Sequence, residues 1–144
     1  MGARHPHIEL RPCRVQDIAA VLALWAQAAT AGSVTDHPDA IRKRLERDAD
    51  LFLLAWDGDR LVGSLIGGWD GWRGNMYRLA VAPDYRCRGI ARKLVGAVEH
   101  RLRLRGAERI TVLVAKHEEP ARAFWRSVDY VDDTEMGRYA KNMG

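Results

Sequence analysis

The sequence predicts an α/β fold in which helices flank a mixed β-sheet. Segments with alternating apolar residues, typical of strands, interchange with segments in which apolar residues recur every three or four positions, typical of helices. The stretch 76–115 reads as strand, helix and strand, and such a connection is expected to be a right-handed crossover between parallel strands. An Asp-Gly pair at 57–58 between two apolar runs indicates an antiparallel hairpin as well.

The chain is expected to start with a strand and a helix. The stretch "HIELRPC" alternates apolar and polar residues, so a strand is predicted over 8–13. Apolar residues then recur with the period of an amphipathic helix, at Val15, Ile18, Leu22, Trp25 and Ala29. Of these residues, Trp25 is expected to lie in the core.

A second helix and a hairpin should follow the break "TAGSVTDHPD". Asp36 as N-cap and Pro38 in the first turn predict where this helix begins. Its inward residues are expected to be Ile41 and Leu45. The apolar runs 51–56 and 61–69 are joined by "DGDR", and we predict that they pair as an antiparallel hairpin.

The second half of the chain is expected to alternate strands and helices. A strand over 76–82 ends at Pro83, and the next helix begins near Gly89 and stops at Gly106. The apolar face of that helix is expected to hold Ile90, Leu94, Val98 and Leu102. A buried parallel strand over 109–115, a short helix over 118–128 and a last strand region over 130–141 complete the prediction.

The length of 144 residues suits a single domain over 1–144. The most apolar helical stretch, 18–29, is too short to cross a bilayer and contains Gln27. The N-terminus lacks the apolar core of a signal peptide. Two cysteines, Cys13 and Cys87, do not make a disulfide framework, so a cytosolic, reduced protein is expected.

Positive charge is concentrated in one part of the chain. Between Arg86 and Arg105, seven basic residues face one acidic residue, whereas the other 124 residues carry 16 basic and 18 acidic side chains. A nucleic-acid-binding protein is expected to show a broad basic face. The confined excess favours a compact polyphosphate ligand over a duplex.

The stretch "YRCRGIARKLV" (85–95) suits such a ligand. The first amides of a helix have no intrahelical acceptors and attract phosphate. Gly89 leaves room for close approach, and Arg86 and Arg88 can donate to phosphate oxygens. The sequence has neither GxxxxGK[ST] nor GxGxxG after a strand, the patterns of two other phosphate loops. The alternative is a solvated basic helix start in which the glycine only turns the chain.

Residues 86–91 fit the pattern [R/Q]-x-x-G-x-[G/A], and "YRLAVAPDYRCRGIARKLV" extends it to a whole strand–turn–helix block. This block resembles the acetyl-CoA loop of the GNAT superfamily of N-acetyltransferases, and "ARAFWRSVDYVDD" is similar to a later helix and strand of it. The stretch 51–74 most resembles small bacterial acetyltransferases of the YpeA type. The resemblance covers the chain from Ile8 to about Lys141. It implies a mixed, mostly antiparallel sheet of six to seven strands with a splayed parallel pair, flanked by about four helices.

The resemblance also implies acetyl-CoA as cosubstrate, lying in the opening of the splayed pair. The pantetheine arm would pair with the strand backbone, and the pyrophosphate would rest on the amides of 87–91. The thioester oxygen would accept from the amide of Leu79 or Val81, as in an oxyanion hole. The implied cofactor-binding residues are Leu79, Ala80, Val81, Arg86, Cys87, Arg88, Gly89, Ile90, Ala91, Arg92 and Trp125.

The implied reaction is direct transfer of the acetyl group to a primary amine. An alkylammonium ion has a pKa of about 10, so a base, often through water, must take its proton. Asp70 and Glu118 are the candidate bases. Each has a structural alternative, because Asp70 can cap its own turn and Glu118 can stand as an acid at a helix N-terminus.

The acid that usually protonates the departing thiolate in this superfamily is a tyrosine, and Trp125 occupies its position here. Glu118 stands where the family often has Asn. Tyr77, Tyr130 and Tyr139 are the possible substitutes, and a thiol with a pKa of about 8.5 also leaves readily without an acid. The alternative function is therefore a CoA-binding sensor or accessory module with little or no catalysis.

The acceptor is expected to enter at the loop that follows residue 68. The substrate-binding residues predicted there are Trp69, Trp72, Arg73 and Tyr77. Aromatic rings beside an aspartate suit an amine with an apolar body, whether a small molecule or a protein amine, while Arg73 equally suits a substrate carboxylate. We predict no bound metal, no nucleic acid and no membrane as partners, and a homodimer through an exposed strand edge stays open.

Overall fold

The computed structural model describes residues 7–28 and 32–144. The chain divides into a larger unit that ends at Val112 and a smaller one from Leu113 to Gly144, and each is described by itself. No helix among the described residues has the length and apolar character that crossing a membrane requires.

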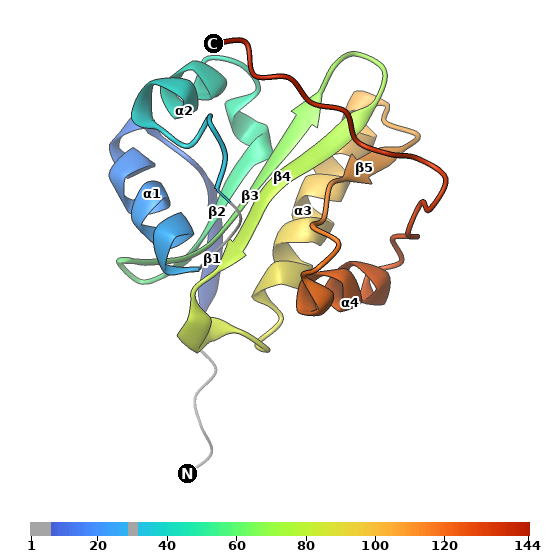
Figure 1. The fold of residues 1–144 in the computed structure, drawn as a ribbon. Helices are drawn as coiled ribbons and strands as arrows, with labels where there is room; N and C mark the ends of the chain where they lie inside the picture. Colours follow the sequence, from blue (N-terminus) through green and yellow to red (C-terminus); the bar gives the residue numbers. More distant parts are fainter. Residues whose placement is uncertain (1–6, 29–31) are drawn as a thin grey trace. The chain divides into compact units, whose positions relative to one another are not determined.

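The larger unit contains a five-stranded mixed sheet (Figure 1). Its strands lie in chain order: β1 (Ile8–Pro12), β2 (Phe52–Asp57), β3 (Arg60–Trp69), β4 (Gly74–Val81) and β5 (Ile110–Val112). Pairing is antiparallel from β1 to β4 and parallel between β4 and β5. The predicted α/β class, hairpin and parallel pair are confirmed, but the prediction of six to seven strands is wrong for the described residues.

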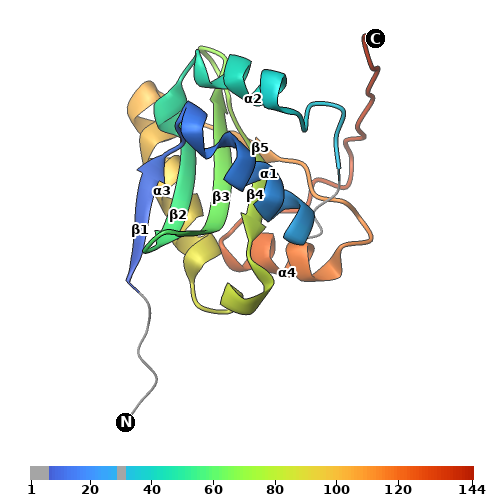
Figure 2. The ribbon, with the colours of Figure 1, turned by 90° about the vertical axis from the view of Figure 1, so that its left-hand side faces the viewer.

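Two helices cover one face of this sheet and a third covers the other (Figure 2). The helices α1 (Ile18–Gln27) and α2 (Pro38–Leu45) lie on one face, and α3 (Ile90–Arg105) lies on the opposite face. Glycines in the strands let α3 approach closely: a Cβ at Gly67 would come within 2.7 Å of Val98, and one at Gly63 within 3.1 Å of Leu94. The predicted apolar face of this helix is confirmed, because Ile90, Leu94, Val98 and Leu102 are all buried.

The first helix begins later than predicted. Val15 belongs to a 3₁₀ turn, Val15–Asp17, that ends before α1, and its side chain is exposed. The buried carboxylate of Asp17 accepts from the Arg14 amide at 2.9 Å, which fixes this turn ahead of the helix. Trp25 is buried, as predicted. Ala29, which the helical pattern included, lies outside the described residues.

The second helix has His37 rather than Asp36 as its N-cap. The Nδ1 atom of His37 accepts from the amide of Ala40 at 3.2 Å, and Pro38 occupies the first turn as predicted. The carboxylate of Asp36 is instead paired with Arg78 of β4. The prediction of Asp36 as N-cap was wrong because its carboxylate accepts from Arg78, and a partner 42 residues away cannot be seen in the local sequence.

The end of the chain has less regular structure than predicted. The strand expected over 109–115 is limited to Ile110–Val112, and its residues are half-buried or exposed rather than buried. The smaller unit contains α4 (Glu119–Ser127), and no strand forms over 130–141. Apolar side chains are sparse in this last stretch, and Val131 and Tyr139 are almost fully exposed, so it has no face to bury.

Candidate cofactor loop and acceptor pocket

A β-bulge interrupts β4 halfway along the strand. Ser64 of β3 is opposite Ala80, but Ile66, two residues later, is opposite Tyr77, so β4 carries one extra residue. Arg78 lies in this bulge with a φ of 58°, in the left-handed region that residues other than glycine rarely adopt. The parallel pairing of β4 with β5 has already ended at Met76 and Val112. The bulge therefore follows directly after the last residue of β4 that pairs with β5.

A buried hydrogen-bond chain fixes the peptide group at the bulge. The hydroxyl of Ser64, which has no solvent exposure, donates to the carbonyl of Arg78 at 3.0 Å and accepts from the indole nitrogen of Trp25 at 2.9 Å. In a planar trans peptide the carbonyl and the following N–H point in opposite directions. With the Arg78 carbonyl directed at Ser64, the N–H of Leu79 points away from Ser64.

The side chain of Arg78 is held separately from its carbonyl. Its guanidinium pairs with the carboxylate of Asp36, and it lies 4.6 Å from the ring centre of Trp25. Burial lowers the pKa of this guanidinium. The ion pair connects the segment before α2 to the bulge, so Trp25 and Asp36 both hold Arg78 in its unusual conformation.

The predicted phosphate loop follows β4, as the sequence indicated. A 3₁₀ turn, Pro83–Tyr85, leads to two residues with positive φ, Cys87 at 62° and Gly89 at 80°, and Gly89 is the N-cap of α3. In this geometry the amides of the first helical turn have no acceptors within the helix, and the helix dipole is positive there. The loop therefore presents backbone donors at the start of a 16-residue helix.

The basic residues around Gly89 are not equivalent. Arg86 donates to the carbonyl of Ala28 at 3.0 Å, and Lys93 donates to the carbonyl of Ile8 at 2.6 Å. Arg88 lies over the ring of Tyr85, 4.9 Å from its centre, and both Arg88 and Arg92 are exposed. All four side chains are exposed to solvent, but two of them also tie the loop to backbone carbonyls elsewhere in the fold.

The turn between β2 and β3 holds the segment that precedes the loop. The Tyr85 hydroxyl donates to Asp57 at 2.5 Å, and Arg60 donates to both oxygens of Asp84 at 2.7 and 2.8 Å. The bond from Arg60 lowers the pKa of Asp84, and the bond to Asp57 raises that of Tyr85. Exposed pairs contribute little stability singly, but these fix where β4 leads into the loop.

We expect a Cys87→Gly variant to be more stable than the natural chain. A residue with a side chain pays roughly 1 kcal/mol or more to hold a φ near 60°, and glycine does not, although its unfolded state gains entropy. Urea unfolding should show a higher midpoint with an unchanged slope. A lower midpoint would contradict this account of the loop.

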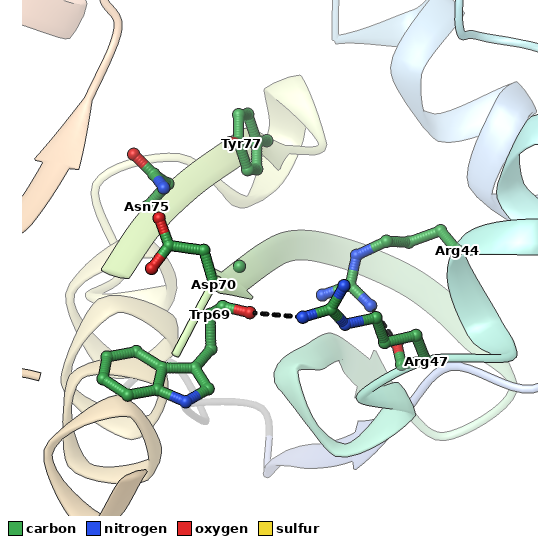
Figure 3. Close-up of a pocket in the computed structure, with 7 residues that line it drawn as sticks. Arg44, Arg47, Trp69, Asp70, Asn75 and Tyr77 are labelled. Atoms are coloured by element: carbon green, nitrogen blue, oxygen red, sulfur yellow. Dashed lines mark hydrogen bonds between the residues drawn. The ribbon is translucent and has the colours of Figure 1, made fainter. Parts of the chain in front are cut away.

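A pocket of about 250 Å³ lies at the far end of β3 and β4 from the loop (Figure 3). Its lining residues are Arg44, Arg47, Gly68, Trp69, Asp70, Asn75 and Tyr77. The structure thus brings together three residues predicted around the acceptor: Trp69, Asp70 and Tyr77. Trp72 is largely exposed and Arg73 lies over its ring at 4.1 Å, and neither residue lines the pocket.

Arg44 and Arg47 were missed in the sequence analysis. Arg44 lies in the last turn of α2 and Arg47 lies two residues beyond the end of this helix, and a basic last turn is ordinarily explained by the helix dipole. Arg44 donates to the carbonyls of Gly67 and Arg47, and Arg47 donates to the carbonyl of Trp69 at 3.2 Å. Contacts with a strand more than 20 residues away gave no signal in the local sequence.

Asp70 caps its own turn, which is the structural alternative that the sequence analysis gave for it. One of its carboxylate oxygens accepts from the amides of Arg73 at 2.7 Å and Trp72 at 2.8 Å, which closes the turn between β3 and β4. These backbone bonds lower the pKa of the carboxylate. A carboxylate held ionised in this way is a weak proton acceptor.

The smaller unit holds the remaining predicted residues. Glu118 is the N-cap residue of α4 and lies 3.6 Å from the imidazole of His117, with both side chains substantially exposed. Trp125 is buried and meets Phe124 and Tyr130 edge-on, with ring centres 5.4 and 5.0 Å apart. Of the three tyrosines that the sequence offered in place of the usual acid, Tyr130 lies beside Trp125, whereas Tyr139 is fully exposed.

Comparison with known proteins identifies the family. Residues 18–130 match the model of the acetyltransferase (GNAT) family. Acetyltransferase ECA0875 of Pectobacterium atrosepticum is 35% identical over 133 residues, which cover 91% of this chain and 94% of that protein. Acetyltransferase SG1711 of Sodalis glossinidius is 36% identical over 123 residues, covering 85% and 87%. The chain belongs to the acetyltransferase (GNAT) family.

Solved structures show the same fold. The PaiA N-acetyltransferase of Thermoplasma acidophilum, in complex with coenzyme A, superposes with a TM-score of 0.77 at 18% identity and covers 89% of this chain and 92% of its own. The protein is thus an acyltransferase that uses acetyl-CoA as its cosubstrate. The narrower resemblance to YpeA-type enzymes stays a prediction.

Proposed function

We propose that this enzyme transfers the acetyl group of acetyl-CoA directly to a primary amine, and that the whole chain, 1–144, acts as one domain. The observation that carries this proposal is that β4 joins two features of one cosubstrate site. A bulge with a buried anchor lies in the strand at Arg78, and a helix N-terminus bordered by exposed arginines follows the same strand at Gly89.

In this proposal the cosubstrate runs along the second half of β4. Its pyrophosphate accepts from the amides of Cys87 to Ala91, and Arg88 and Arg92 add charge-assisted bonds. Arg86 supports the loop from behind through the Ala28 carbonyl. The pantetheine arm lies along the backbone of Leu79, Ala80 and Val81, past the end of the pairing with β5. Trp125, which occupies the position of the family's usual tyrosine, is also proposed to contact the cosubstrate.

The thioester oxygen accepts from the N–H of Leu79 in this arrangement. Ser64 holds the preceding carbonyl, so this amide is oriented before substrate binds. A fixed donor stabilises the charge that develops on the carbonyl oxygen during attack. The neutral amine forms the new C–N bond, the C–S bond breaks, and the CoA thiolate leaves. The proton of the attacking amine passes to water.

The reaction should therefore accelerate with pH until the amine itself is neutral. For an alkylamine, whose ammonium ion has a pKa of about 10, the neutral fraction, and with it kcat/KM, should rise about tenfold per unit between pH 7 and 9. For a peptide α-amine, whose pKa is about 8, the rise should level off above about pH 8. Asp70→Asn should show the same slope and nearly the same rate, whereas loss of a general base would lower the rate by about 10²-fold or more. Steady-state rates at five pH values test this.

Asp70→Asn also offers a control on folding. A carboxylate with a lowered pKa stabilises the fold above the pKa of the unfolded chain, about 3.9, and that contribution is lost as the pH falls through the folded value. The natural chain should thus exceed Asp70→Asn in stability at neutral pH, and the difference should vanish in acid. A large loss of rate with unchanged stability would make Asp70 the base, and Glu118→Gln tests the other candidate in the same assay.

Release of thiol from acetyl-CoA tests the proposed function directly. The assay follows thiol formation from pH 7 to 9 with free amino acids, peptides with free N-termini, polyamines and arylamines, each against a reaction without amine. Release above that background with one class, together with the acetylated amine by mass spectrometry, is the expected result. Binding of acetyl-CoA without transfer to any class would contradict the proposal and favour the sensor alternative.

A further inference from the structure

We propose that the pocket beside Arg44 and Arg47 binds a carboxylate of the acceptor, so that the acceptor is an amine with a carboxylate about one dipeptide length away. This inference rests on the proposed function, because it names the acceptor class for the same site. The argument uses the charge of the pocket, its distance from the bulge and the shape of its floor.

The pocket has one strongly cationic wall. The guanidinium groups of Arg44 and Arg47 lie together on this side, and Asp70 and Asn75 lie on the other (Figure 3). Burial is the main influence on the guanidinium of Arg44 and lowers its pKa, while Asp48 raises this pKa and the charge of Arg47 lowers it. Both guanidiniums donate to backbone carbonyls, which carry no full charge to offset them.

Two carboxylates near the arginines offset this charge only in part. Asp70, on the opposite wall, already accepts from two backbone amides of its own turn. Asp48 lies 3.5 Å from Arg47, but it also accepts from Arg105 at 2.7 Å, so its charge is shared. Arg47 is largely exposed, with 73% of its side chain accessible, and keeps donors for a ligand. An anion between the two guanidiniums would relieve their mutual repulsion and gain charge-assisted bonds. A carboxylate fits a pocket of this size.

The pocket lies within reach of the reacting carbonyl. Tyr77 lines it and is two residues from Leu79, and because β4 is bulged between them their separation is at most about 7 Å. The amine must lie at the thioester beside Leu79, and the carboxylate must lie beside Tyr77, where it faces the arginines. An extended dipeptide spans about the same 7 Å. An α-amino acid, whose amine and carboxylate share one carbon, is too short to reach both.

The floor of the pocket suits a flat, peptide-like acceptor. The ring of Tyr77 lies on Gly68, where an added Cβ would come within 3.1 Å of a ring carbon. Glycine at this position thus allows the ring to lie against β3. Tyr77 and Asn75 line the pocket across from the two arginines (Figure 3).

Dipeptides and their C-terminal amides test the proposal as matched pairs. The natural enzyme should acetylate the free acid with a kcat/KM about tenfold above that of the amide, mainly through KM, since one charge-assisted bond is worth at least that factor. Arg47→Gln should bring the acid down to the level of the amide and leave the amide unchanged. Arg42→Gln, an exposed arginine of the same helix paired with Asp39, should change neither.

Equal kcat/KM for acid and amide, or an equal loss on both in Arg47→Gln, would overturn the assignment while leaving the acetyltransferase function intact. A binding measurement separates the two proposals further. The Nε–H signals of Arg44 and Arg47 in nuclear magnetic resonance spectra should shift with an N-acetylated dipeptide acid and not with its amide. This readout needs no turnover, so an absence of shifts would refute the carboxylate site even if no amine were acetylated.

Discussion

Replacing Gly89 by valine is expected to weaken the binding of acetyl-CoA by about 100-fold or more. The N-cap glycine has a φ of 80°, which a β-branched residue adopts only with strain. Apart from its two chain neighbours, no described residue has an atom within 4 Å of an added Cβ, so the new side chain would point into the open space in front of the loop. A ligand that makes several amide contacts there would lose two or more, each worth about 1.5 kcal/mol.

Gly106→Val provides the matched control for this experiment. Gly106 caps the other end of α3 with a φ of 103°, and here too an added Cβ would have no atom within 4 Å among the residues that the structure describes, its chain neighbours apart. Both variants should lose a similar amount of stability in urea, but only Gly89→Val should lose affinity in isothermal titration with acetyl-CoA. Equal affinities in the two variants would remove the loop from the cosubstrate site.

A Ser64→Ala variant should lose catalytic rate without losing the cosubstrate. The alanine leaves the carbonyl of Arg78 without its anchor, so the peptide that carries the Leu79 N–H can rotate. Removal of an oxyanion donor costs about 10²- to 10³-fold in kcat, and loosening one should cost roughly 10- to 100-fold. The KM for acetyl-CoA should change little, because the pyrophosphate loop is untouched. Saturating-rate measurements at fixed pH give both constants.

Trp25→Phe separates this positioning role from general destabilisation. It removes the indole donor to Ser64 but leaves the bond from Ser64 to Arg78. Each variant removes at least one buried hydrogen bond of Ser64, at a cost of about 1 kcal/mol or more in stability. We expect Trp25→Phe to keep most of its kcat at a temperature where both variants are folded. A kcat that falls equally in both would assign the loss to stability rather than to the amide.

The features that local sequence determines were predicted well. Asp-Gly at 57–58 marks the hairpin, and glycines at 89 and 106 mark both ends of α3, since each position requires a backbone that glycine adopts readily. The apolar repeat from Ile90 to Leu102 identified the face that packs on the sheet. The turn at Asp70 was foreseen as one of two alternatives.

The features that depend on distant contacts were not predicted. The bulge at Arg78 arises from its pairing with β3 and its anchor on Ser64, and no residue in "MYRLAVA" signals an extra position. The hydrogen bonds from Arg86 and Lys93 to carbonyls 58 and 85 residues away could not be read from the local sequence. Arg44 and Arg47 were not predicted to line a pocket because their contacts are with carbonyls of β3, more than 20 residues away. The periodicity of a sequence predicts which residues are buried, but not which distant residues they contact.

An amide titration with acetyl-CoA tests the central claim most directly. Assigned ¹H–¹⁵N spectra of the full chain would be recorded as acetyl-CoA is added. The account predicts that the largest shifts occur at two places on one strand–loop unit, the amides of Leu79 to Val81 and those of Cys87 to Arg92. Shifts confined to other parts of the chain, such as the basic end of α3 around Arg103, would contradict it.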